Sequence, residues 1–284
     1  AFIYSTIMFA IRLRIAKRDN KNTVDQDHDD NALKLSFELA KIVEHSYKAK
    51  NYVDVVRFGS QLSRPLWLSG MYHERIRIGQ MIEDSASRVG MYEEQVIALI
   101  DDIGWTNAVI GNLDKAETHI SDGVKLALEK RNFYYAAKGE RHLAIMAERY
   151  KGQIDEANAH FEEALRITEM ISHENDREEI RAGILYGTAE LCIVEKDFSK
   201  ALSLALESKE LYEKLGGQEE RLVKSRSQLG KIYLELNEIQ KAKDYFRVGL
   251  DEAQRLQRQD EIAINLLGLG EVNFKTQEYN IAIE

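Results

Sequence analysis

Residues 229–246 read LGKIYLELNEIQKAKDYF, and this stretch decides the fold. A small residue, Gly230, comes shortly before Tyr233, and after a polar turn Ala242 precedes Phe246 by four positions. Because residues four apart share one face of an α-helix, the stretch predicts two helices joined by a short turn. Bulky side chains of one helix would lie beside small residues of the other, which allows a close antiparallel pair.

The same pattern recurs along the chain. Six short segments combine a polar turn with an apolar or aromatic residue: SGMYHER, IGNLDKA, KGQIDEA, EKDFSKA, LNEIQKA and TQEYNIA. Their last residues are Arg75, Ala116, Ala157, Ala201, Ala242 and Ala282, at intervals of 41, 41, 44, 41 and 40. Self-similarity at a fixed period of this length is typical of stacked repeats, each of which buries its apolar face against its neighbours.

The composition favours the same class. The 284 residues include one proline, 17 glycines and 8% aromatic residues, which argues against a β-sandwich or barrel and for long helices with short connections. The net charge of −9 gives no basic field for nucleic acid. The single cysteine, Cys192, excludes an internal disulfide framework and fits a reducing compartment, so we expect a cytoplasmic protein. Together with the low proline content, the composition predicts an all-α fold.

The chain is expected to have three parts. Residues 1–17 are apolar but interrupted by Arg12, which predicts a helix; a clipped membrane anchor is the alternative, since a span needs about 20 apolar residues. Residues 18–30 form a polar linker, and 31–284 the repeats. The units are approximately 51–90, 91–131, 132–175, 176–217, 218–258 and an incomplete 259–284. Because no Met begins the chain and the pattern is cut at its end, we expect a piece of a longer protein.

Pro65 is the one irregularity inside a predicted helix. A proline either kinks a helix or marks the start of a new one. We expect a kinked helix over Tyr52–Leu68, because Ser63 then keeps the small-residue register.

The stretch 229–246 matches the pattern L-G-x2-Y…A-x3-F and so resembles a tetratricopeptide repeat. It departs from that family at Arg226, where the first-helix tryptophan would stand, and at Gln254, in place of the closing proline. The period of about 41 exceeds the usual 34. The resemblance implies a right-handed α-solenoid of antiparallel helix pairs.

A second resemblance concerns residues 51–127. Their segments LWLSGMYHER and DDIGWTNAVIGNLDKAE are similar to long-period repeats at the C-terminal end of bacterial STAND-type (NB-ARC-like) signalling ATPases. In that family the repeats act as the sensor behind a nucleotide-binding module. The resemblance implies a protein- or peptide-binding sensor region. A peptide-pheromone-responsive regulator and an adaptor fused to a catalytic module outside this chain are the alternatives.

In tetratricopeptide arrays the second, fifth, ninth and twelfth positions of each first helix, here called wall positions, line the concave groove. When these positions are transferred to this sequence by the repeat register, the resemblance implies the following binding residues: Arg64, Asp101, Trp105, His142, Met146, Arg149, Tyr186, Glu190, Lys224 and Lys231. Aromatic and arginine side chains often dominate binding energy. Packing of Trp105 against a neighbouring unit, and a solvated face at Lys224 and Lys231, remain alternatives. The expected partner is a protein or peptide, with no nucleic acid and no membrane; the oligomeric state stays open.

Motifs for chemistry are absent from the sequence. It contains no G-x-x-x-x-G-K-[ST], H-E-x-x-H, G-x-S-x-G or C-x-x-C. The seven histidines are scattered, and the acidic pair Asp101-Asp102 has the spacing of ordinary helix decoration. We therefore expect no catalysis, no metal and no cofactor in this chain.

Overall fold

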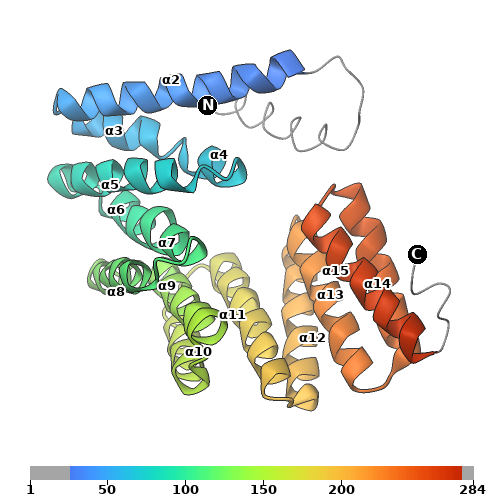
Figure 1. Ribbon diagram of the computed structural model, residues 1–284. Coiled ribbons are helices and arrows are strands. Elements are labelled where there is room, and N and C mark those ends of the chain that lie inside the picture. Colours follow the sequence, from blue (N-terminus) through green and yellow to red (C-terminus); the bar gives the residue numbers. More distant parts are fainter. Residues whose placement is uncertain (1–25, 277–284) are drawn as a thin grey trace. The chain divides into compact units, whose positions relative to one another are not determined.

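The structure, a computed structural model, describes residues 26–276, with side chains from Phe37 onward (Figure 1). The predicted helix over 1–17 lies outside the described residues. Within 26–276 the chain forms helices and turns and no strand, which confirms the all-α class. None of these described helices combines the length and the apolar character that crossing a bilayer takes. The described residues divide into two compact units, the first ending at Met146 and the second beginning at Ala147.

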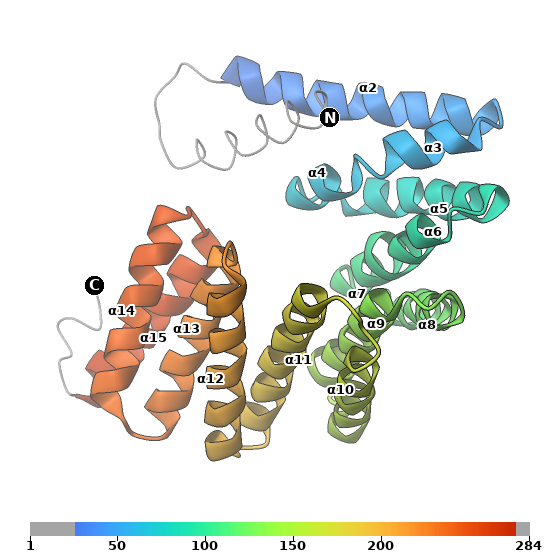
Figure 2. The same cartoon turned by 180° about the vertical axis from the view of Figure 1, so that it is seen from behind.

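The helices of the first unit follow one another with short turns. They are α2 (Gln26–Lys48), α3 (Tyr52–Gly59), α4 (Ser63–Leu68), α5 (Tyr72–Val89), α6 (Tyr92–Ile97), the π-helix η1 (Ala98–Trp105), α7 (Thr106–Val109), α8 (Leu113–Glu129) and α9 (Phe133–Met146). In both views α2 lies along α3, which in turn packs on α5 (Figures 1 and 2). Helix α2 starts inside the predicted linker 18–30, since the acidic residues there suit a helix N-terminus through the helix dipole.

The second unit repeats the helix-pair design. Its elements are the π-helix η2 (Ala147–Lys151), α10 (Ile154–Thr168), α11 (Glu174–Val194), α12 (Phe198–Leu215), α13 (Glu219–Glu235), α14 (Ile239–Arg255) and α15 (Gln259–Lys275). Helix α11 packs on α12, α13 on α14, and α14 on α15 (Figure 2). Cys192 lies buried in a core built from α11 to α15, which also contains Phe246.

Glycines let the paired helices approach closely, and at Gly230 the repeat pattern predicts this. A Cβ added at Gly230 would lie 2.7 Å from the ring of Phe246, and one at Gly187 would lie 2.7 Å from the ring of Phe161. Real Cβ atoms do not come so near, so each aromatic ring fills the space that the missing side chain leaves. Gly90 ends α5 in the left-handed region, at φ 74°, where a residue without Cβ is favoured.

The expectation of one kinked helix around Pro65 was wrong. Helix α3 ends at Gly59, and α4 begins at Ser63, so the chain breaks over 60–62 and a new helix starts. Pro65 lies in the first turn of α4, where backbone N–H groups have no partner inside the helix. The proline therefore removes no helical hydrogen bond there.

Candidate ligand-binding pocket

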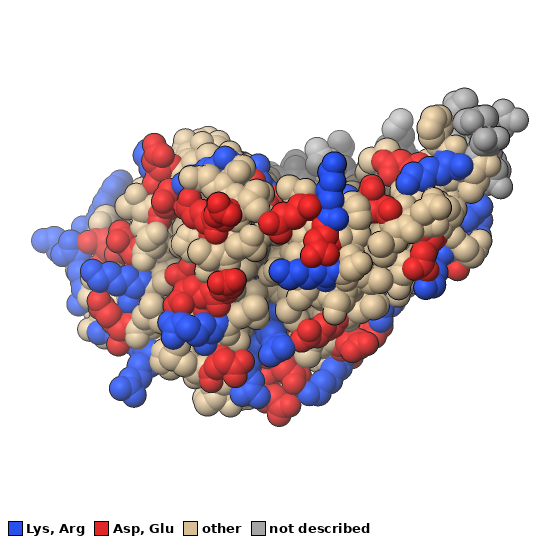
Figure 3. Space-filling view, turned by 90° about the horizontal axis from the view of Figure 1, so that it is seen from below, with Lys and Arg blue, Asp and Glu red and all other residues tan. Residues whose placement is uncertain are grey.

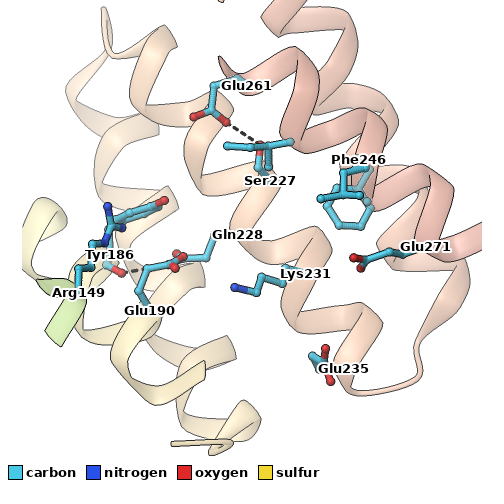
Figure 4. Close-up of a pocket in the computed structure, with 13 residues that line it drawn as sticks. Arg149, Tyr186, Glu190, Ser227, Gln228, Lys231, Glu235, Phe246, Glu261 and Glu271 are labelled. Carbon is cyan, nitrogen blue, oxygen red and sulfur yellow. Dashed lines mark hydrogen bonds between the residues drawn. The ribbon is translucent and has the colours of Figure 1, made fainter. Parts of the chain in front are cut away.

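The second unit contains a pocket with a volume of about 420 Å³ (Figure 4). Its size falls within the range of small-molecule and peptide side-chain sites. The lining comes from η2, α11, α13, α14 and α15. These residues are Arg149, Tyr186, Glu190, Ser227, Gln228, Lys231, Glu235, Phe246, Glu261, Ile264, Leu267, Gly268 and Glu271.

Four of the predicted wall residues meet in this pocket: Arg149, Tyr186, Glu190 and Lys231. They come from three successive repeats and lie around one cavity because the register repeats with the helix pairs. Lys224 is also in this unit, on α13, but it is half-buried and lies outside the lining.

The pocket also includes three residues at wall positions of the last repeat, for which the sequence analysis predicted no binding residues. Ile264, Leu267 and Glu271 lie 18, 15 and 11 residues before Ala282, the same offsets that place wall residues before Ala242. Extending the register by one repeat would have identified all three. Outside the register are five further lining residues, for which the sequence carries no such signal: Gln228, Glu235, Phe246, Glu261 and Gly268.

Side-chain hydrogen bonds fix the middle of the pocket. The amide Nε2 of Gln228 donates to Oε1 of Glu190 at 2.7 Å and to the backbone oxygen of Tyr186 at 3.0 Å. One residue earlier, the hydroxyl of Ser227 donates to Oε2 of Glu261 at 3.0 Å. In Figure 4, Ser227 and Gln228 lie on α13, between α11, which carries Tyr186 and Glu190, and α15, which carries Glu261. Gln228 and Glu261 are 3% and 4% exposed, so they are held in place rather than mobile in solvent.

Charges of both signs line the pocket, with four carboxylates against two cations. Arg149 Nε lies 3.6 Å from Oε2 of Glu148, which sits beside the lining on η2. Burial raises the pKa of the Glu148 carboxyl and, more strongly, the pKa of the Tyr186 phenol. Burial also raises the pKa of Glu261. The pocket can therefore pair with charged ligand groups in a partly desolvated setting, where such pairs are stronger than in water.

The predicted residues of the first unit form a separate, interior cluster. Lys138 Nζ lies 2.6 Å from Oδ2 of Asp101, and His142 Nε2 lies 3.4 Å from Oδ1 of the same carboxylate. The rings of Trp105 and His142 stack at 4.4 Å between centroids. Although burial alone would raise it, the charge of Lys138 and the His142 contact hold the pKa of Asp101 below its ordinary value. These contacts favour the packing alternative for Trp105.

Two of the predicted wall residues, His142 and Met146, are buried within the first unit and lie outside the lining of the pocket. Met146 is 2% exposed and packs in the core beside Leu143. A flexible thioether commonly fills such gaps. His142 is 5% exposed. The π-helix η1 includes Asp101 and Trp105, and its extra residue per turn rotates side chains away from the α-helical register that the prediction assumed.

Arg64 lies apart from both clusters. It is exposed on the short helix α4, in the repeat whose first helix is broken. That break removes the continuous helix on which its wall position depends.

Outside the pocket the surface is mixed in charge. On the face drawn in Figure 3, Lys and Arg side chains alternate with Asp and Glu side chains. Ion pairs also form along single helices, such as Arg166 with Glu163 and Lys209 with Glu213. In the part of the chain that the structure describes, no group of three or more His, Cys, Asp or Glu side chains is placed to hold a metal ion.

Comparison with known proteins identifies the fold. No protein-family model and no curated protein matches the chain. Among solved structures, the apo quorum sensor NprR from B. thuringiensis aligns with a TM-score of 0.64 at 14% identity, covering 99% of this chain and 74% of that one. NprR in complex with its cognate peptide NprX aligns with a TM-score of 0.63 at 16% identity, covering 99% and 76%.

A third similar structure is a signal transduction ATPase with numerous domains (STAND) from Pyrococcus horikoshii, which has a tetratricopeptide repeat sensor. It aligns with a TM-score of 0.61 at 15% identity and covers 88% of this chain but 38% of that one. These likenesses confirm that the chain has the fold of a tetratricopeptide repeat array.

Proposed function

We propose that this chain is a protein- or peptide-recognition array that acts by binding rather than by catalysis, and that the pocket of the second unit is its binding site. The observation that carries the proposal is the convergence of wall positions from four successive repeats, at Arg149, Tyr186, Lys231 and Leu267 among others, on one cavity. Repeat arrays use successive repeats in this way to build an extended binding surface.

The chemistry of the lining suits a peptide. Ile264 and Leu267 are 47% and 66% exposed and offer apolar contact, while Gln228 and Tyr186 offer polar groups beside them. Pockets that combine apolar walls with a few oriented polar groups bind partly apolar ligands with defined orientation. An extended peptide presents both kinds of group at regular intervals.

We further propose that the array is the sensor region of a larger, cytoplasmic STAND-type signalling ATPase of bacteria. The segments LWLSGMYHER and DDIGWTNAVIGNLDKAE support this reading, as does the likeness to an ATPase with a tetratricopeptide repeat sensor. The full-length gene should then encode a nucleotide-binding loop before the repeats. In the full-length protein, the peptide should change the rate of ATP hydrolysis.

A second candidate is a peptide-responsive regulator. It is favoured by the alignment with NprR, which covers nearly all of this chain and about three quarters of NprR. This candidate requires a helix-turn-helix or three-helix effector module before the repeats in place of a nucleotide-binding loop. The encoded sequence therefore separates the two candidates.

The binding site is tested by affinity selection of random peptides on the full chain, followed by a variant comparison. Leu267→Arg places a long cation in the pocket at an exposed position and should reduce retention of selected peptides at least about tenfold. Val248→Arg is the matched control, because Val248 is 45% exposed on α14 and outside the lining. Equal retention by both variants, or no selected peptide at all, would contradict the proposal.

A further inference from the structure

Glu261 is the most buried carboxylate of the pocket and has no cation beside it. It is 4% exposed, and among the described residues no Lys, Arg or His nitrogen lies within ion-pair distance of it. The nearest positive influences are Lys224 and Arg258, which act at longer range, and Arg258 already pairs with Asp260 at 2.8 Å. A buried carboxylate without a counter-charge is costly, so a cation that reached Glu261 would be bound favourably.

A second buried acceptor lies in the same lining. Oε1 of Gln228 has no hydrogen-bond partner within the described part of the chain, although its amide nitrogen is engaged twice. Gln228 follows Ser227, the residue that holds Glu261. The pocket therefore presents two fixed acceptor groups. Glu261 receives a hydrogen bond from Ser227 but has no cation within ion-pair distance, and Oε1 of Gln228 receives no hydrogen bond from the described residues. Guanidinium and ammonium groups are donors only, with five and three N–H bonds.

Both cations of the lining, Arg149 and Lys231, act electrostatically on Glu148 rather than on Glu261. Arg149 lies near Glu148, and Arg149, Glu190 and Lys231 all influence the titration of Glu148. Figure 4 shows Arg149 and Glu190 on the α11 side, while Glu261 lies across Ser227 at the start of α15. With four carboxylates against two cations in the lining, the excess negative charge faces the ligand.

We propose that the pocket recognises a cationic side chain, Arg or Lys, of the peptide ligand, through Glu261 and Gln228, with the aliphatic stem lying on Ile264 and Leu267. This inference rests on the proposed peptide-binding function and specifies the class of peptide. Long cationic side chains bury their methylene groups on apolar surface while the charged end keeps polar partners, which fits the order of groups along this lining.

The test uses defined peptide pools on the immobilised full chain. Acetylated, amidated heptapeptides carry Arg, citrulline or Glu at the central position, with flanks randomised over Ala, Leu, Ser and Gly. Citrulline keeps the shape of arginine without its charge. Retention measured by mass spectrometry should favour the Arg pool over the citrulline pool by about tenfold, as expected for a charge-assisted pair.

Two variants separate the charge of Glu261 from its packing. Glu261→Gln, which retains size and hydrogen-bonding capacity, should reduce the preference for arginine to about twofold or less. Glu210→Gln is the matched control, because it makes the same change at an exposed residue of α12 outside the lining, and it should leave the preference intact. A preference that survives Glu261→Gln unchanged would overturn the assignment of Glu261.

The remaining outcomes distinguish the two proposals. Equal retention of the Arg and citrulline pools, or preference for the Glu pool, would overturn the cation site while leaving a peptide-binding pocket. Retention of no pool would contradict the peptide-binding function itself, and the cation site with it. Free spermidine is added as a competitor to test whether the cation must belong to a peptide. Displacement of the bound Arg pool by spermidine at an equal concentration would show that a free polyamine, not a peptide, fits the site.

Discussion

Nη2 of Arg75 lies 2.9 Å from Oδ1 of Asp102, and both side chains are buried in the first unit. Arg75 occupies the position at which later repeats have alanine, as at Ala116. Its guanidinium also donates to the Thr106 hydroxyl at 2.6 Å and lies over the ring of Trp67. One repeat thus replaces a small packing residue by a buried ion pair with several hydrogen bonds.

This pair predicts an asymmetric response to mutation. Arg75→Met should lower the free energy of unfolding by about 3–5 kcal/mol, because the Asp102 carboxylate then stays buried without its cation. The double variant Arg75→Met with Asp102→Leu should recover at least about 1 kcal/mol of that loss. Urea denaturation followed by circular dichroism measures both. A double variant no more stable than Arg75→Met would assign the cost to lost packing instead.

His142 predicts how stability depends on pH. Burial lowers its pKa to about 4, from an ordinary value of 6.5. Nε2 contacts Asp101 while Nδ1 has no partner among the described residues, so a second proton would be buried unpaired. As pH falls below about 6.5 the unfolded chain binds this proton first. The contribution of neutral His142 to stability is therefore complete above 6.5 and is lost as pH falls towards 4.

The variant His142→Phe isolates this effect, since it keeps an aromatic ring against Trp105. Between pH 7.5 and 4.5, the free energy of unfolding of the natural chain should fall by about 2 kcal/mol more than that of the variant. Urea titrations at four pH values across this range give both profiles. Parallel profiles would show that His142 titrates alike in the folded and unfolded chains.

The repeat register accounts for much of the pocket. Offsets from the repeated alanines place Tyr186, Glu190 and Lys231 around one cavity, and the same offsets applied once more give Leu267. Such positions are predictable because each helix pair presents its faces in the same way to its neighbours. Glu261 lies outside these offsets, and its burial depends on how α13 and α15 pack, which no local pattern records.

The first unit departs from the register for physical reasons that the sequence does not show. Asp102 has the spacing of surface decoration, yet it is buried because its partner, Arg75, lies in the preceding repeat. The π-helix η1 rotates Asp101 and Trp105 away from the α-helical face. At Pro65 the sequence is compatible with either a kinked helix or the start of a new helix. The structure has a new helix, α4, which packs on α5.

Gly230 predicts a stability change of unusual sign. At an exposed helical site, glycine to alanine stabilises by about 1 kcal/mol. Gly230→Ala should instead destabilise by about 1–3 kcal/mol, because its Cβ would lie 2.7 Å from the ring of Phe246. In a Phe246→Leu background the same alanine should be neutral or stabilising. Thermal unfolding of the four proteins completes the cycle; a stabilising alanine beside the intact ring would contradict the packing.

Substitution of Trp105 distinguishes a structural role of this side chain from a role in ligand binding. It is half-buried, stacks on His142 and packs on the core of the first unit. Trp105→Ala should lower the free energy of unfolding by about 2–3 kcal/mol while leaving peptide affinity unchanged. Urea denaturation and fluorescence anisotropy with a selected peptide provide the two readouts. Weakened affinity at unchanged stability would restore Trp105 as a ligand contact.

The location of a bound peptide tests the central claim most directly. A selected peptide carrying a photoreactive benzoylphenylalanine at each position in turn is irradiated with the full chain, and the cross-linked residues are mapped by mass spectrometry. The pocket predicts cross-links on α11, α13 and α15, within 174–194, 219–235 and 259–275. Cross-links confined to residues 26–146 would place the ligand in the first unit and contradict the assigned site.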